Sequence, residues 1–189
     1  RKIDPYAAVR LTDDRNDDTA PSWTRDGRIR FYRIYGDNRT ESWIMNADGS
    51  GQTIITSPDG RRVAFTATDQ NRTITLWVRD LESLSARQLP GTEGAVSPFW
   101  SPDGRYLAFG VGLTLRKVDV AGGPVQKIAD SLTSVGVGAW NRDGTIVYGT
   151  RGVGPVNRVS ASGGTPVPVT RLDETRVERG HAFPVFLPD

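Results

Sequence analysis

The sequence contains no cysteine, a single histidine and no apolar run long enough to cross a membrane. The absence of cysteine excludes disulfide bridges and thiolate-bound metals. A zinc site built on histidines needs several of them, and a Ser–His–Asp triad would have to use His181. We therefore expect no metal or other cofactor, and no direct insertion into a membrane.

The net charge is small, and the sequence motifs of common enzymes are missing. The 24 basic and 22 acidic residues are interleaved and leave a net charge of +2, so no basic stripe indicates a nucleic-acid partner. The sequence has no G-x-S-x-G nucleophile turn, and it lacks the H-R-D and D-F-G motifs of protein kinases. We predict that this chain is not an enzyme by itself.

A short phrase recurs along the chain. It reads WSPDGRYLAF from Trp100, WTRDGRIRF from Trp23, TSPDGRRVAF from Thr56 and WNRDGTIVY from Trp140, and a shorter copy, FLPD, begins at Phe186. The copies recur at intervals of roughly 40 residues, which is typical of propeller blades with about four strands each.

The phrase itself predicts a β-hairpin. Pro102 fixes its φ angle near the value that a type I turn needs, and Asp103 can bond to the local backbone. Gly104 accepts a positive φ without steric cost. Leu107 and Phe109 then point to one face of the following strand, because strand side chains alternate.

The remainder of each repeat predicts two further strands, separated by a turn that is glycine-rich in three copies. The predicted fold class is all-β: a β-propeller of four-stranded antiparallel blades, with about four blades present as an incomplete ring or as part of a larger propeller. A β-sandwich with accidental hairpin similarity is the alternative, and it explains the repeats poorly. The predicted boundaries are the last strand of a preceding blade at 1–14, blades at 20–56, 57–91, 95–131 and 134–173, and the first strand of a following blade at 182–189.

Several segments resemble a known family. VRLTDDRNDDTAPSWTRDGRIRF and WIMNADGSGQTII resemble the TolB-like propeller repeats, also described as WD40-like, and the resemblance covers nearly the whole chain. The second half is also similar to propeller regions fused to bacterial serine/threonine protein kinases. The resemblance implies a bacterial protein in the periplasm, or elsewhere outside the cytoplasm, that binds a protein or ligand partner.

Two features depart from a regular closed ring. In TIITSPDG the fourth strand of one repeat runs directly into the next turn, so we expect a shortened first strand in the blade at 57–91. The strands expected at both ends of the chain lack the other strands of their blades, and open sheet edges favour association. Membership of a larger propeller, or self-association that completes the ring, would cover these edges.

The acidic stretch 13–18 has two interpretations. Asp14, Asn16 and Asp18 are spaced like the start of a calcium loop. The glycine and the glutamate that complete such a loop are missing, so a solvated turn is the favoured interpretation.

The tryptophans also have two interpretations. Trp23, Trp100 and Trp140 share one repeat position, which predicts packing between blades, and Trp43 and Trp77 fall on predicted third strands. An aromatic cage for a ligand is the alternative.

The predicted binding surface lies on one face of the propeller. Loops that join the second strand to the third, and one blade to the next, gather there, and binding residues concentrate on loops held by a rigid scaffold. The candidate residues on this face are Asp17, Asp18, Asp37, Arg39, Asp69, Arg72, Glu93, Arg176, Glu178, Arg179 and His181. We expect a non-catalytic scaffold or sensor for a protein or peptide partner; the alternative is a regulatory or gating propeller of a larger peptidase or serine/threonine kinase.

Overall fold

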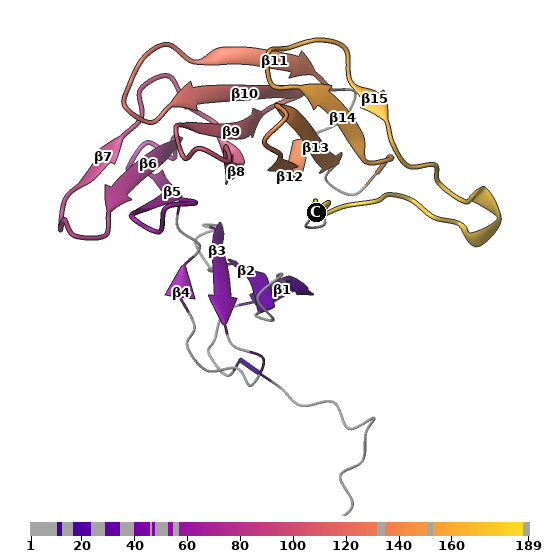
Figure 1. Ribbon diagram of the computed structural model, residues 1–189, viewed down its shortest axis with the longest axis horizontal. Coiled ribbons are helices and arrows are strands. Elements are labelled where there is room, and N and C mark those ends of the chain that lie inside the picture. Colours follow the sequence, from indigo (N-terminus) through magenta and orange to yellow (C-terminus); the bar gives the residue numbers. More distant parts are fainter. Residues whose placement is uncertain are drawn as a thin grey trace, which may run out of the picture. The chain divides into compact units, whose positions relative to one another are not determined.

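A computed structural model describes residues 11–12, 17–23, 29–34, 40–45, 47, 53–54, 57–131, 135–150 and 153–186. The chain divides into two compact units, Arg1–Ile55 and Thr56–Asp189. Figure 1 shows that the described elements are almost entirely β-strands. The one helical element in this part of the chain is a 3-10 turn, η1 (Glu174–Arg176).

The first unit contains one antiparallel sheet. Its strands, in spatial order, are β1 (Asp17–Trp23), β2 (Ile29–Ile34), β3 (Thr40–Met45) and β4 (Thr53–Ile54). Along β2 the alternate residues Ile29, Phe31 and Arg33 are buried, as expected for one face of a strand. Met45 completes this small core, and Trp43 packs against it.

The second unit contains three antiparallel sheets, labelled in Figure 1. The first consists of β5 (Arg62–Thr68), β6 (Ile74–Asp80) and β7 (Ala86–Gln88). The second consists of β8 (Val96–Trp100), β9 (Tyr106–Val111), β10 (Thr114–Asp119) and β11 (Gln126–Asp130). The third consists of β12 (Val135–Trp140), β13 (Thr145–Thr150), β14 (Asn157–Ser160) and β15 (Val167–Pro168). Strands that are neighbours in space are also neighbours in sequence, so each sheet is a meander.

Strand β9 shows how neighbouring sheets of the second unit pack. Leu107 and Phe109, on one face, are completely buried in a cluster with Leu76 of the β5–β7 sheet. Ala108, on the other face, is buried in a cluster with Tyr148 of the β12–β15 sheet. A sheet covered on both faces by other sheets is the packing expected of a propeller blade.

The approach between the β8–β11 and β12–β15 sheets is so close that only glycine fits at some positions. A Cβ atom at Gly110 would lie 2.9 Å from Cβ of Val135, and one at Gly138 would lie 2.7 Å from Cζ of Phe99. Close-packed interiors leave no room for an added atom at such distances. The glycines of β9 and β12 therefore set the separation of these two blades.

The predicted fold class, a β-propeller built of antiparallel blades, is confirmed. The β5–β7 blade has three described strands, and β5 begins at Arg62, directly after the turn. Residues 182–186, predicted as a first strand, form no strand pairing, although Ala182 lies against Gly149 of β13. Residues 11–12 lie outside any strand, and the remainder of the strand predicted at 1–14 is outside the described residues.

No helix in the described part of the chain combines the length and the hydropathy that a membrane span requires.

Candidate binding surface

Two kinds of loop meet on one edge of the second unit. Gly94, in the connection from β7 to β8, donates a backbone hydrogen bond to the carbonyl of Ile74 at the start of β6 (2.8 Å). Ser131, after β11, donates to the carbonyl of Leu113 in the turn between β9 and β10 (2.7 Å). These bonds bring second-to-third-strand loops next to blade-to-blade connections. We call this surface the loop edge, and it comprises residues 69–73, 89–95, 112–113, 131, 153–156 and 169–181.

A buried threonine fixes the connection between β7 and β8. Thr92 Oγ1 accepts the backbone N–H of Leu76 (2.9 Å), and its hydroxyl donates to the carbonyl of Leu89 (2.6 Å). Thr92 is completely buried, whereas the adjacent Glu93 is exposed. Sequence reasoning missed Thr92, because a threonine in a polar loop carries no signal that its side chain turns inward.

Asp69 and Arg72 lie in the turn between β5 and β6. Asp69 Oδ1 accepts the backbone N–H groups of Asn71 and Thr73 (both 2.8 Å), so this carboxylate stabilises the turn. Arg72 has a left-handed backbone, with φ of 63°, and an exposed side chain. Among the described residues, the side chains of Arg72 and Glu93 have no hydrogen-bond or ion-pair partner, so both are available to a ligand.

The long connection that follows β15 is tied to the connection between β13 and β14. The backbone N–H of Gly154 donates to the carbonyl of Arg179, and that of His181 donates to the carbonyl of Gly154 (both 2.9 Å). Glu178 Oε2 accepts the backbone N–H of Asp173 (2.7 Å). This bond, together with the neighbouring His181, lowers the pKa of Glu178. The loop is therefore held against the blade by its backbone.

The two arginines of this connection differ in their environment. Arg176 Nε lies 3.3 Å from Asp173 Oδ2 in an exposed ion pair. The exposed side chain of Arg179 has no such partner in the described part of the chain. Like Arg72 and Glu93, Arg179 therefore carries an exposed charge that forms no ion pair within the described residues.

His181 connects two side chains of the same loop. Its Nδ1 lies 2.8 Å from Thr170 Oγ1, and its Nε2 lies 3.2 Å from Glu178 Oε2. A hydroxyl, an imidazole and a carboxylate follow one another as in a hydrolase triad. However, Thr170 Oγ1 also accepts the backbone N–H of Val156 (2.9 Å), so these groups close the loop onto the blade. Across the described residues, no cluster of His, Asp and Glu side chains could hold a metal ion.

The candidate residues of the first unit have a different environment. Asp17 is exposed at the start of β1. Asp18 was predicted in a loop that contacts a partner, but it lies in β1 and pairs with Arg33 through two hydrogen bonds of 2.8 Å. The side chains of Arg33 and Asp18 are only 6% and 12% exposed, so the carboxylate of Asp18 compensates a buried guanidinium. Three further predictions lie outside the described residues: Asp37, Arg39 and the stretch 13–16.

The opposite edge of the blades carries the recurring turns. The backbone N–H of Ser101 donates to the carbonyl of Tyr106, and that of Gly104, with φ of 67°, donates to the carbonyl of Ser101 (both 2.9 Å). Asp103 Oδ1 accepts the Ser101 hydroxyl (2.6 Å) and the backbone N–H of Arg105 (3.0 Å). The hydroxyl bond is the main reason that the pKa of Asp103 is lowered. We call this surface the turn edge, and it comprises residues 57–62, 101–106 and 141–145.

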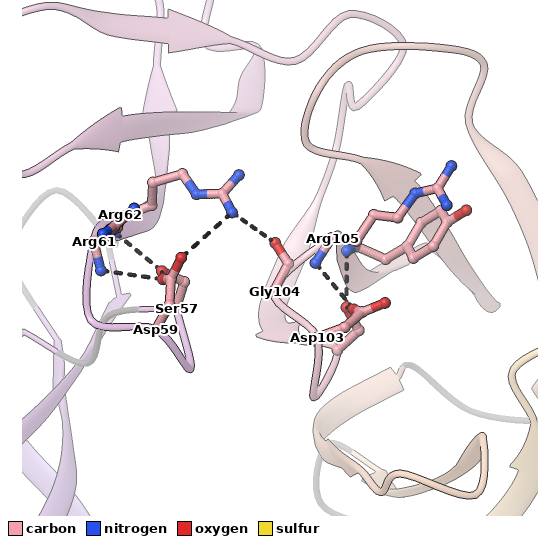
Figure 2. A network of polar contacts seen from close by, with 9 residues as sticks. Ser57, Asp59, Arg61, Arg62, Asp103, Gly104 and Arg105 are labelled. Carbon is pink, nitrogen blue, oxygen red and sulfur yellow. Dashed lines mark hydrogen bonds and ion pairs between the residues drawn. The ribbon is translucent and has the colours of Figure 1, made fainter.

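The turn 57–62 repeats these bonds, and the turn 141–145 has one bond of a similar kind. In the turn 57–62 the Ser57 hydroxyl donates to Asp59, and Ser57 Oγ accepts the backbone N–H of Arg62 (3.0 Å), as Figure 2 shows. In the turn 141–145 Asn141 replaces the serine, and its Oδ1 accepts the backbone N–H of Thr145 (2.8 Å). In each turn, the side-chain oxygen of the first polar residue therefore accepts a backbone N–H from the far side of the turn and stabilises it.

The tryptophans at the ends of β8 and β12 lie between blades, as their shared repeat position predicts. Trp100 packs against the cluster that joins the β5–β7 and β8–β11 blades. Trp140 packs against the next cluster and stacks on Tyr106 of the neighbouring blade, with ring centres 6.2 Å apart. Both tryptophans are half-buried, so part of each ring stays accessible. The side chain of Trp23 lies outside the described part of the chain.

Comparison with known proteins gives two kinds of sequence relative. No protein-family model matches the chain. The uncharacterized peptidase YuxL of Bacillus subtilis is 31% identical over 111 residues, which are 52% of this chain and 17% of YuxL. The Tol-Pal system protein TolB of Anaeromyxobacter sp. (strain K) is 33% identical over 96 residues, which are 43% of this chain and 21% of that protein. The chain thus spans a minor part of the length of the relatives it matches.

Among solved structures, TolB from Acinetobacter baumannii superposes with a TM-score of 0.61 and 19% identity, over 85% of this chain and 45% of that one. At this identity the likeness concerns the fold. It agrees with the meander order of every sheet and with the burial of both faces of β9. The chain folds as a β-propeller region that is similar to the propeller of TolB.

Proposed function

We propose that the chain is a non-catalytic scaffold that binds a protein or peptide partner through its loop edge. One observation carries this proposal: the backbone of the loops is held by hydrogen bonds, whereas several charged side chains on the same loops form no ion pair or hydrogen bond in the described part of the chain. The loops are held by bonds such as those of Thr92 and Gly154, whereas Arg72, Glu93 and Arg179 are exposed and have no partner in the described residues. A rigid loop that presents accessible charges loses little conformational entropy when it binds.

The relatives support a bacterial protein that works with protein partners. The matched TolB carries the name of a protein system, Tol-Pal, and is bacterial. We extend this to the present chain as a periplasmic or other extracytoplasmic location and a protein partner.

A pair of charge-reversal variants tests the proposal. The partner is first captured by the wild-type chain from a bacterial envelope extract, identified and purified, and it is then titrated against both variants. The loop-edge variant carries Arg72→Glu, Glu93→Lys and Arg179→Glu. The matched turn-edge variant carries Arg61→Glu, Arg142→Glu and Asp143→Lys, which are also exposed positions without a side-chain partner in the described residues.

We expect the loop-edge variant to bind at least about tenfold more weakly than wild type. Charged side chains at an interface speed the association of the partner and slow its dissociation, and three of them are reversed in this variant. The turn-edge variant should bind within about twofold of wild type. Loss of binding only in the turn-edge variant would show that the other edge is the binding surface.

The match to peptidase YuxL favours a second candidate function. In a longer peptidase, a propeller of this kind would regulate or gate access to a separate catalytic domain. The test is the hydrolysis of peptides of increasing length by the full-length protein. If the propeller gates entry, the loop-edge variant should alter the rate for long peptides and leave the rate for dipeptides unchanged.

A further inference from the structure

On the turn edge, two neighbouring blade junctions of the second unit share a carboxylate, a tryptophan and a glycine, but they differ at the position that Arg62 occupies in the first. At the junction between the β5–β7 and β8–β11 blades, Arg62 extends from the end of the turn 57–62 across to the turn 101–106. Its Nη2 donates to the carbonyl of Gly104 (3.2 Å), and Figure 2 shows this bond between the two turns. The guanidinium also lies 3.9 Å from Asp59 Oδ2 and 5.8 Å from the ring centre of Trp100. A carboxylate, an indole ring and a carbonyl therefore surround one guanidinium.

The next junction repeats these groups without the guanidinium. By position in the repeat, Asp103 corresponds to Asp59, Trp140 to Trp100 and Gly144 to Gly104. The residue that corresponds to Arg62 is Tyr106, which stacks on Trp140 with an interplanar angle of 26°. Tyrosine can cover part of the indole, but it brings no charge to the carboxylate.

A cleft lies beside Tyr106 at the second junction. It has a volume of about 340 Å³ and is lined by residues of both turns, among them Pro102, Asp103, Tyr106, Trp140, Asn141 and Arg142. Its walls combine two aromatic rings and a proline ring with one carboxylate. A cleft lined by aromatic rings and a few polar groups is a common form of small-ligand site.

The carboxylate of Asp103 at the cleft has no ion pair in the described part of the chain. Among the described residues, no cation lies within ion-pair distance of Asp103, and none lies over the ring of Trp140. The cations beside Tyr106 are already engaged: Arg105 pairs with Asp119 (2.8 Å), and Lys117 donates to the carbonyl of Ala161 (2.8 Å). Arg142, the remaining cation at the cleft, is exposed to solvent, where screening limits its repulsion of a ligand.

We propose that this cleft binds the guanidinium group of an arginine side chain in a partner peptide. The ligand lies beside Tyr106, among the groups that correspond to those around Arg62 one blade earlier: a carboxylate, an indole ring and a turn carbonyl. Guanidinium suits these walls better than ammonium, because it is planar, stacks on aromatic rings and donates hydrogen bonds along its edge. The site lies on the turn edge and is independent of the partner surface on the loop edge.

A titration of the chain, followed through the indole N–H resonances of its tryptophans, tests the proposal. The probe is the blocked tripeptide acetyl-Gly-Arg-Gly-amide, and Trp140→Phe assigns the resonance of Trp140. We expect a saturable shift of that resonance. The lysine analogue should bind at least about threefold more weakly, and the uncharged citrulline analogue should not bind measurably.

Variants of the cleft sharpen the test. Asp103→Asn keeps the turn geometry and should weaken binding at least about fivefold, because a charge-assisted bond becomes a neutral one. Arg142→Gln should tighten binding about twofold by removing a like charge. The loop-edge variant should bind the tripeptide like wild type, which separates this site from the proposed function.

Tyr106→Arg places an arginine inside the cleft, as Arg62 is placed at the first junction, and should abolish binding of the tripeptide. Its fold is checked by its melting temperature, and Asp103→Asn remains informative if this variant does not fold. Equal affinity for the arginine and citrulline peptides would overturn the proposal, and so would wild-type binding by a folded Tyr106→Arg chain.

Discussion

The two junctions on either side of the β8–β11 blade differ in how they are filled. Toward the β5–β7 blade, β9 presents Leu107 and Phe109, which are completely buried among side chains of that blade. Toward the β12–β15 blade, β9 presents Ala108 and Gly110. Strand β12 lies so close to Gly110 that the glycine has no room for a side chain. One strand thus fills one junction with large side chains and allows close contact of backbones at the other. Propeller packing therefore does not require identical blades; it requires that the volumes on facing strands be complementary.

The largest expected effect concerns the junction with large side chains. Phe109→Ala should lower the free energy of unfolding by about 4 kcal/mol, because a completely buried aromatic ring leaves a cavity. Chemical denaturation with tryptophan fluorescence measures the change. Leu113→Ala, at a side chain that is 54% exposed, is the control and should stay within about 0.5 kcal/mol of wild type. Similar losses in both variants would contradict the packing described for β9.

The close junction should be broken by adding a single carbon atom. Gly138→Ala would place its Cβ 2.7 Å from Phe99 Cζ and 2.7 Å from the Val147 carbonyl oxygen. Since a backbone atom is one of these neighbours, we expect a loss of about 2–3 kcal/mol. Gly144→Ala is the matched control: no atom lies within 4 Å, but φ is 74°, so only a backbone cost of about 1 kcal/mol remains. If the two variants have equal free energies of unfolding, Gly138 is not closely packed.

The half-buried tryptophans should contribute less than the core. Trp140→Ala should cost about 2 kcal/mol, roughly half the value for a fully buried aromatic residue, because part of the ring is solvated in the folded state. Trp100→Ala should cost a similar amount, and it also removes the ring beneath Arg62. Thermal melts of both variants measure this, and an unchanged melting temperature in either one would exclude that ring from the junction.

The turn hydroxyls should have smaller effects that are alike at both junctions. Ser101→Ala removes the hydroxyl that donates to Asp103 and accepts from the Tyr106 N–H, and it should cost about 1 kcal/mol. Ser57→Ala removes the same bonds in the preceding turn and should cost about as much. The hydroxyl of Ser85 makes no such bonds, and Ser85→Ala should be neutral in the same denaturation experiment. A cost confined to one turn would show that the two are not equivalent.

The dependence of stability on pH should follow from the same turns. The Ser101 hydroxyl lowers the pKa of Asp103 below its ordinary value of 3.8, and the Ser57 hydroxyl does so for Asp59. A lowered pKa in the folded state means that the contribution is complete above the ordinary value and is lost as the pH falls through the folded value. We therefore expect the melting temperature to fall below about pH 4, and less steeply in Asp103→Asn. An equally steep fall in wild type and variant would show that Asp103 does not contribute.

Much of this architecture can be predicted from local sequence. The turn at Ser101–Tyr106 depends on residues within six positions of one another, so its Pro, Asp and Gly chemistry is visible in one phrase. The alternation of Leu107 and Phe109 similarly predicts a buried strand face. The repeat then predicts the number of strands in a blade and the position of Trp100 and Trp140 between blades.

The contacts that distinguish the junctions could not be predicted in this way. Arg62 reaches a carbonyl 42 positions away, and Gly138 lies opposite Phe99 of another blade. Asp18 belongs to an acidic run, and nothing local reveals that it faces Arg33 across a strand pair. Such pairs depend on which blades become neighbours and on side-chain rotamers, which a single repeat does not encode.

The most direct test of the difference between the two junctions is an exchange of the residues that cover their tryptophans. In the double variant Arg62→Tyr, Tyr106→Arg, the arginine-filled junction and the open junction change places. We predict that this variant still binds one equivalent of acetyl-Gly-Arg-Gly-amide, and that binding now shifts the indole resonance of Trp100 and is lost in a further Trp100→Leu change. If the folded double variant still binds at Trp140, the residue after the turn does not decide which junction is open.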